Sequence, residues 1–158
     1  MWQKIKPYVL SVAIALGVGG LAAFLTRNSM DIYAEVIQPP LAPPAILFPI
    51  VWTILYILMG IGAAIVYTKQ SSDPPAARNA LTFYAMQLIV NFAWSIIFFN
   101  YRAFLFALIW LLLLLYLIIR MILAFHKISP LAAYLQIPYA LWVSFAGYLN
   151  LGIWFLNR

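Results

Sequence analysis

The chain has 158 residues, of which 67% are hydrophobic and only 8% are charged, with a net charge of +6. A soluble domain carries about a quarter of its residues as charged side chains, so nine basic and three acidic residues cannot cover a water-facing surface, and we expect an integral membrane protein. The basic residues are scattered rather than clustered, which excludes a nucleic-acid-binding face, and the lack of cysteine excludes disulfides and thiolate metal sites.

Five continuous apolar segments follow one another, each near the ~20 residues that a membrane-spanning helix needs. They lack the period-two alternation of barrel strands, so helices fit better. We expect an all-α integral membrane bundle of five transmembrane helices, forming a single domain over residues 1–158. The predicted helices cover residues 7–26, 44–68, 76–99, 103–125 and 131–155.

Proline and capping residues mark the helix boundaries. Asp73 and Ser129 each precede proline, which predicts an N-cap followed by proline in the first helical turn. Pro49 and Pro138 lie inside predicted spans, so we expect kinks in the second and fifth helices.

The distribution of Lys and Arg predicts the orientation. Five spans put the N-terminus and the second and fourth loops on one side of the membrane. That side holds six basic residues, and the other side holds three, so we expect a cytoplasmic N-terminus with the first loop and the C-terminus outside. The six are Lys4, Lys6, Lys69, Arg78, Arg120 and Lys127, and the three are Arg27, Arg102 and Arg158.

Small residues near the start of the third segment predict close helix packing. Ala76, Ala80 and Ala85 lie there, and small residues let membrane helices approach closely. We therefore expect a homodimer that uses this helix.

Polar and aromatic side chains inside the spans need a reason, because burying polar groups in lipid is costly. The third segment places them three or four residues apart on one helical face, and the second and fifth segments carry further aromatic residues. The third segment carries Gln87, Asn91, Trp94 and Ser95, the second carries Trp52 and Tyr56, and the fifth carries Tyr139, Trp142, Ala146 and Asn150. One interpretation is that Gln87, Asn91 and Asn150 only join helices by hydrogen bonds. The other, favoured by the similar depth of the large rings, is a ligand pocket in the outer half of the bundle.

Chemically reactive groups are missing from the spans. No Asp, Glu or Lys falls inside any of them, and the single His126 follows a helix end. We therefore expect no catalytic residues and no metal site, and a proton- or ion-coupled pump is disfavoured. The predicted pocket suits recognition of a flat apolar ligand.

Four motifs now point to a family. They are Q-P-P-L-A-P-P at Gln38–Pro44, preceded by Tyr33; F-P-I-V-W-T-I-L-Y-I-L-M-G at Phe48–Gly60; Y-A-M-Q-L-I-V-N-F-A-W-S-I-I-F-F at Tyr84–Phe99; and P-Y-A-L-W-V-S-F-A-G-Y-L-N at Pro138–Asn150. In these motifs the whole chain resembles the TspO/MBR family, the tryptophan-rich sensory proteins related to the translocator protein, or peripheral benzodiazepine receptor.

The resemblance implies a dimeric five-helix membrane receptor, here in a bacterial cell membrane, that binds protoporphyrin IX or a related tetrapyrrole as a ligand rather than as a permanent cofactor. Benzodiazepine-site compounds are further ligands of the family. The residues carried over to the pocket are Tyr33, Trp52, Tyr56, Asn91, Trp94, Trp142 and Ala146. Asn91 and Tyr33 would orient the ligand by hydrogen bonds. Residues 27–43 would form a lid, with Pro39, Leu41, Pro43 and Pro44 in or beside it.

Two positions depart from the family pattern. Leu41 stands where the family usually has a Trp linked to light-dependent porphyrin breakdown, so we expect little of that activity, and we expect Leu41→Trp to raise it. No Lys or Arg lies within five residues after Tyr148, so the sterol motif proposed for animal members is absent.

Besides a receptor or sensor, three alternatives stay open: a passive tetrapyrrole or sterol transporter, a protein that degrades porphyrin in light, and a regulator that contacts a partner protein.

Overall fold

The computed structural model describes residues 1–158, and every regular element in it is a helix. The elements are α1 (Trp2–Thr26), η1 (Arg27–Ser29), α2 (Ile32–Glu35), α3 (Leu47–Thr68), α4 (Pro74–Ser95), η2 (Ile96–Asn100, a π-helical turn), α5 (Phe104–His126), α6 (Pro130–Tyr134) and α7 (Ile137–Leu156). Five of these helices, counted with their short extensions, are long and apolar enough to cross a membrane. The predicted all-α bundle of five membrane-spanning helices is confirmed.

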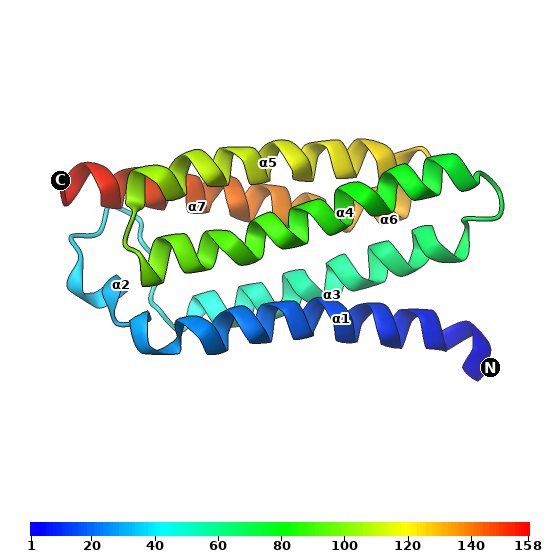
Figure 1. The fold of residues 1–158 in the computed structure, drawn as a ribbon, viewed down its shortest axis with the longest axis horizontal. Coiled ribbons are helices and arrows are strands. Elements are labelled where there is room, and N and C mark those ends of the chain that lie inside the picture. Colours follow the sequence, from blue (N-terminus) through cyan, green and yellow to red (C-terminus); the bar gives the residue numbers. More distant parts are fainter.

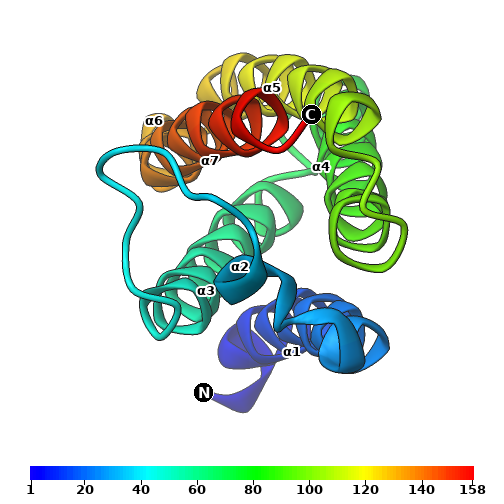
Figure 2. The same ribbon diagram turned by 90° about the vertical axis from the view of Figure 1, so that its left-hand side faces the viewer.

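The five spans run along the long axis of the molecule (Figure 1). The N-terminus and the α3–α4 loop lie at one end, and α2 and the C-terminus lie at the other (Figure 1). Around the bundle, α1 packs against α3 and α4, α4 against α5, and α5 against α7. Seen from the α2 end, the segment that follows α2 crosses towards α7 before it returns to the start of α3 (Figure 2).

Helices α1 and α3 pack closely at a glycine. A Cβ atom on Gly60 of α3 would lie 2.5 Å from the Cα atom of Val12 in α1, closer than real atoms approach. The hydroxyl of Ser11 donates a hydrogen bond of 2.7 Å to the carbonyl oxygen of Gly60. Glycine therefore lets the two backbones meet without an intervening side chain.

Both predicted helix caps are present. The carboxylate of Asp73 accepts a hydrogen bond of 3.2 Å from the backbone N–H of Ala76, at the start of α4. The hydroxyl of Ser129 accepts one of 3.3 Å from the N–H of Ala132, at the start of α6. Each cap satisfies a donor that the first helical turn leaves free.

The prediction of a kink was wrong for Pro49, whereas the fifth span is interrupted close to Pro138, as expected. Pro49 is the third residue of α3, where no helical hydrogen bond is lost, so it gives no mid-helix kink. The fifth span is not one helix from 131 to 155, because it breaks at Leu135 and Gln136 and resumes as α7. Pro138 is the second residue of that new helix, a position that tolerates proline.

The three alanines of α4 do not share one surface. Ala80 is fully buried inside the bundle, whereas Ala85 is exposed. Ala80 therefore packs within its own chain and cannot lie at a surface between two copies, contrary to the expectation from the sequence.

Large apolar side chains cover the outside of the spans. Ile89 of α4, Ile109 of α5 and Leu141 of α7 are 67%, 58% and 66% exposed. Exposed apolar side chains on spans of this length face lipid rather than water. The chain is thus an integral, multi-pass membrane protein.

Candidate functional site

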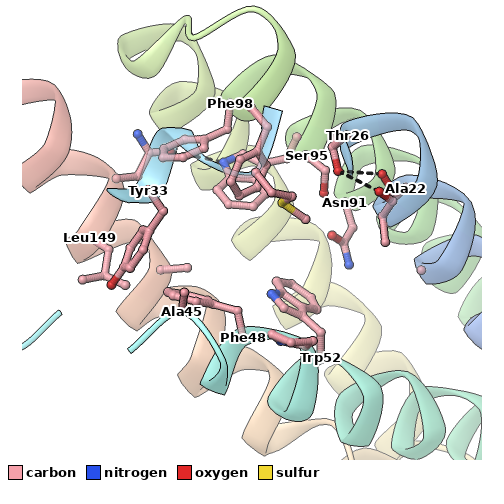
Figure 3. A pocket seen from close by; sticks show the side chains of 18 of the residues that line it. Ala22, Thr26, Tyr33, Ala45, Phe48, Trp52, Asn91, Ser95, Phe98 and Leu149 are labelled. Carbon is pink, nitrogen blue, oxygen red and sulfur yellow. Dashed lines mark hydrogen bonds between the residues drawn. The ribbon is translucent and has the colours of Figure 1, made fainter. Parts of the chain in front are cut away.

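A cavity of about 350 Å³ lies between the helices at the α2 end of the bundle. Fifteen of its 21 lining residues are hydrophobic, which matches the apolar character of small-molecule sites. Helices α1, α3, α4 and α7 form its sides, and the segment around α2 covers its end. In Figure 3, Phe48 and Trp52 lie on one side of the cavity and Asn91 and Ser95 on the other.

The cavity brings together all seven residues that the sequence predicted for the pocket. They come from α2, α3, α4 and α7 and are Tyr33, Trp52, Tyr56, Asn91, Trp94, Trp142 and Ala146. The π-helical turn η2 extends the wall with Phe98 and Phe99.

Aromatic rings form most of the wall. The ring centroids of Trp52 and Tyr56 are 5.7 Å apart, as are those of Phe48 and Trp142. Trp94 stacks on Phe98 at a centroid distance of 5.2 Å. Ring contacts of this kind stabilise the wall beyond their buried area and present flat surfaces to a ligand.

The floor of the cavity is a buried chain of hydrogen bonds. The amide nitrogen of Asn91 donates to the hydroxyl of Tyr139 at 2.9 Å, and that hydroxyl donates to the amide oxygen of Gln87 at 2.7 Å. All three side chains are almost completely buried. Gln87 does not line the cavity, so it only joins helices by a hydrogen bond, which is one of the two interpretations drawn from the sequence. Asn91 does both: it lines the cavity and joins α4 to α7.

The indole nitrogens of two wall tryptophans differ in their partners. Trp94 Nε1 donates to Asn150 Oδ1 at 3.2 Å, and Asn150 in turn donates to the carbonyl oxygen of Phe104 at 2.9 Å. Trp142 Nε1 is buried and has no hydrogen-bond partner. An unpaired buried N–H is costly, so no hydrogen bond helps to hold the indole of Trp142 in this position.

Tyr33 covers the cavity from α2. Its hydroxyl donates to the carbonyl oxygen of Pro43, and its ring meets Phe48 edge-on at 5.0 Å. Burial raises the pKa of the Tyr33 hydroxyl above its ordinary value. Tyr33 thus uses its hydroxyl proton within the protein, whereas Asn91 uses only one of its two amide N–H bonds and keeps the other, together with its amide oxygen, for a ligand.

The lid predicted at residues 27–43 is fastened to α7, and from here on the name covers the whole segment between α1 and α3, Arg27–Ile46. The side chain of Asn157 makes two hydrogen bonds of 2.9 Å with the backbone of Ile37, one to its N–H and one to its carbonyl oxygen. Tyr148 donates a hydrogen bond of 2.6 Å to the carbonyl oxygen of Pro40.

Two further contacts hold the lid. Arg102 forms an ion pair of 2.9 Å with Glu35, and both side chains are about half exposed. Pro39 is buried against Gly152 of α7, where an added Cβ atom would lie 2.5 Å from the proline ring. These contacts, together with those of Asn157 and Tyr148, are called the lid latch below.

The residues singled out in the lid do not line the cavity. Pro39, Pro43 and Pro44 shape or fasten the lid, whereas Met30, Tyr33 and Ala45 face the cavity. Leu41 is 84% exposed and has a φ of 68°, so its side chain lies on the outer surface of the lid.

Sequence reasoning missed the contributions of α1 and of Phe48. Gly19, Ala22 and Thr26 line the cavity from α1, and Phe48 lies one turn before Trp52. The signal was present, because Gly19, Ala22 and Thr26 are spaced by three and four residues and share a face of small side chains. Phe48 similarly precedes Trp52 and Tyr56 at intervals of four.

Comparison with known proteins gives a consistent result. The model of the TspO/MBR family matches residues 10–155. The chain is 36% identical to the tryptophan-rich protein TspO of Chlorobaculum tepidum, over 99% of both chains. It is 36% identical to the translocator protein of Bos taurus, over 96% of this chain and 92% of that one. It is also 35% identical to protein CrtK of Rhodobacter capsulatus, over 79% of this chain and 78% of that one.

Proposed function

Because the chain belongs to the TspO/MBR family, we propose that it is a membrane receptor for porphyrins of the protoporphyrin IX type and similar flat apolar ligands. The observation that carries this proposal is the lidded cavity whose walls are aromatic rings from α3, α4 and α7. A flat conjugated ligand would stack on these rings, and its apolar surface would be buried between them and shielded from water.

The free N–H of Trp142 supports a particular mode of binding. Asn91 and Tyr33 already make hydrogen bonds within the protein, whereas Trp142 Nε1 has no partner. If the ring turns towards the cavity, a carbonyl or carboxylate oxygen on the ligand can accept a hydrogen bond from this N–H. The orienting hydrogen bonds would then come from Trp142 after its ring has turned, and from the remaining N–H and the oxygen of the Asn91 amide.

The closed floor favours a receptor over a straight channel. Asn91, Tyr139 and Gln87 fill the bundle below the cavity with side chains that are hydrogen-bonded to one another. A ligand moving through to the other membrane face would have to break this chain. Passive transport remains the alternative, and flux of protoporphyrin IX across proteoliposomes would test it.

The size of the cavity sets a condition on the ligand. Its volume lies near the lower end of the range for small-molecule sites, which runs from about 300 to 1,000 Å³. A porphyrin macrocycle is a large ligand for such a space. Binding would therefore require side chains of the wall or the lid to move.

A titration with protoporphyrin IX tests the proposal. The quenching of tryptophan fluorescence is measured as the porphyrin is added to the purified protein in lipid nanodiscs. We expect saturable quenching that a benzodiazepine-site ligand reverses by competition. Quenching that stays linear in porphyrin and resists competition would mean partitioning into lipid, and the proposal would be wrong.

The light-dependent alternative is tested in the same sample. Leu41 stands where the family usually has a Trp, so this chain carries no indole ring at that position of the lid. We propose that bound porphyrin is stable to illumination. Its absorbance under light, compared with porphyrin in empty nanodiscs, is the measurement.

A further inference from the structure

A second hollow lies on the outside of the bundle, between α3 and α7. It is a groove lined almost entirely by apolar side chains, among them Ile54 and Leu141, which are 52% and 66% exposed. Counted at ~1.5 Å per residue, these two residues lie roughly 10 Å and roughly 20 Å from the lid-side ends of their helices. The groove therefore faces the hydrocarbon of the bilayer, which is about 30 Å thick.

Trp142 is common to the groove and the cavity. Its side chain lines both hollows, so it forms part of the wall that separates the cavity from lipid. Other tryptophans are fixed by hydrogen bonds: Trp94 Nε1 donates to Asn150, and Trp110 Nε1 donates to the carbonyl oxygen of Val90 at 2.8 Å. Trp142 Nε1 has no such partner. Packing alone holds this ring, so a change of rotamer breaks no hydrogen bond.

The backbone leaves this seam open. The main chain of α3 runs close to α1 and α6 but hardly approaches α7. The two helices are joined at the break before α7, where Gln136 Nε2 donates to the carbonyl oxygen of Leu58 at 3.1 Å and the Gln136 side chain fills the space beside Gly62. Beyond this fixed point, side chains rather than helix contacts close the gap between α3 and α7.

The lid closes the other route to the cavity more firmly than the seam between α3 and α7 closes this one. The lid latch fastens the lid by three hydrogen bonds to α7, an ion pair and a buried proline. Opening the lid breaks several of these contacts together, whereas opening the seam requires one ring to turn.

We propose that ligands reach the cavity from within the bilayer, through the seam between α3 and α7, with Trp142 as the side chain that moves. This inference rests on the proposed function and adds that the ligand enters from the lipid bilayer rather than from water. The ligand class is narrowed to molecules that dissolve in the hydrocarbon of the membrane before they bind.

The absence of cysteine makes a direct test possible. Ser95 lines the cavity, so the Ser95→Cys variant carries one thiol there. The variant is placed in vesicles loaded with N-phenylmaleimide, with glutathione in the water to consume any reagent that leaves the bilayer. A second sample receives a charged, water-soluble methanethiosulfonate instead. The rate with N-phenylmaleimide is divided by the rate for Leu141→Cys, whose thiol faces lipid. The rate with the water-soluble reagent is divided by the rate for Leu41→Cys, whose thiol lies on the outer surface of the lid.

We expect the lipid-dissolved reagent to label the cavity thiol at about its reference rate. The water-soluble reagent should label it at least about tenfold more slowly than its own reference, equivalent to a barrier higher by about 1.4 kcal/mol. If the water-soluble reagent is the faster of the two after this normalisation, or if neither reagent reaches the thiol, the inference is wrong.

Two second-site changes separate the seam from the lid. Leu141→Trp in the Ser95→Cys background narrows the groove and should slow labelling from the bilayer about tenfold, whereas Leu112→Trp, at a lipid-facing position of α5, should not. Asn157→Ala weakens the lid latch and should leave labelling from the bilayer unchanged. Faster labelling in Asn157→Ala together with no effect of Leu141→Trp would place the route through the lid. Labelling requires no porphyrin, so failure of the proposed function and failure of this route give different results.

Discussion

The amide nitrogen of Asn91 donates a hydrogen bond of 2.9 Å to the hydroxyl of Tyr139, although Asn91 also lines the cavity. The same hydroxyl donates to Gln87, so Tyr139 joins two polar side chains of α4 to α7. This makes Tyr139, rather than Asn91, the central member of the floor.

The first prediction follows from that arrangement. Tyr139→Phe leaves the Asn91 amide and the Gln87 oxygen without their shared partner and should lower the free energy of unfolding by about 1–3 kcal/mol. Asn91→Ala removes one hydrogen bond and should cost about 0.6 kcal/mol, the mean for such bonds between membrane helices. Unfolding in mixed detergent micelles gives both values. A loss of porphyrin affinity in Asn91→Ala without any loss of stability would show instead that the amide binds the ligand.

The second prediction concerns Trp142. Trp142→Leu removes both the stacking surface and the free N–H, and it should weaken protoporphyrin IX binding by about 1.4 kcal/mol or more, which is tenfold in the dissociation constant. Trp142→Phe keeps a ring and should lose less. Titration in nanodiscs provides the constants.

The control for Trp142 is chosen from the structure. Trp110 is unsuitable because its indole nitrogen donates to the carbonyl oxygen of Val90. Trp2 is 61% exposed near the N-terminus, at the end of the molecule away from the lid, so Trp2→Leu should bind porphyrin like the parent. Equal losses in the Trp2 and Trp142 variants would argue against a specific site.

The third prediction compares two glycines of facing helices. Gly60→Ala places a Cβ atom 2.5 Å from the backbone of Val12, so α1 and α3 must move apart, at a cost of about 1–3 kcal/mol. Gly17→Ala meets nothing within 4 Å and should be neutral or slightly stabilising, since alanine favours helix. Thermal melting of the two variants measures the difference, and similar melting temperatures would contradict the close contact.

The fourth prediction tests our proposal of a homodimer that uses α4. Ala80 is buried within the chain, so Ala80→Leu should lower the melting temperature whatever the oligomeric state. Ala85 is exposed, so Ala85→Trp should leave the melting temperature of the monomer unchanged and weaken the dimer. Light scattering in detergent reports the mass. A parent protein that is monomeric at all concentrations would exclude the dimer, and a dimer that Ala85→Trp leaves intact would assign it to another helix.

The fifth prediction is the orientation in the membrane. The excess of Lys and Arg at the N-terminal end predicts that this end faces the cytoplasm and that the lid faces outside. Alkaline phosphatase fused after Arg158 should therefore be active, and a fluorescent protein fused before Met1 should be fluorescent. Activity of the phosphatase at the N-terminus alone would reverse the assignment.

Much of this protein follows from its sequence. Continuous apolar runs fix the number of spans, because a helix is the only open-ended element that satisfies its backbone hydrogen bonds within lipid. Asp73 and Ser129 mark helix starts by local chemistry, since a cap bonds to residues two or three positions away. The wall residues of α3, α4 and α7 could be predicted because helical spacing decides which side chains share a face.

The tertiary structure decided what those side chains do. Spacing puts Asn91 and Trp142 towards a common interior, but only the packed bundle gives Asn91 a partner in Tyr139 and leaves the indole of Trp142 without one. The place of the Gln136 side chain likewise depends on Gly62 of another helix, which leaves room for it and which no local pattern reveals. Hydrogen bonds and close contacts between distant segments depend on how the helices cross, and local sequence patterns describe each helix alone. The fold and the cavity wall were therefore predictable, whereas the pairing of polar groups and the seam beside Trp142 were not.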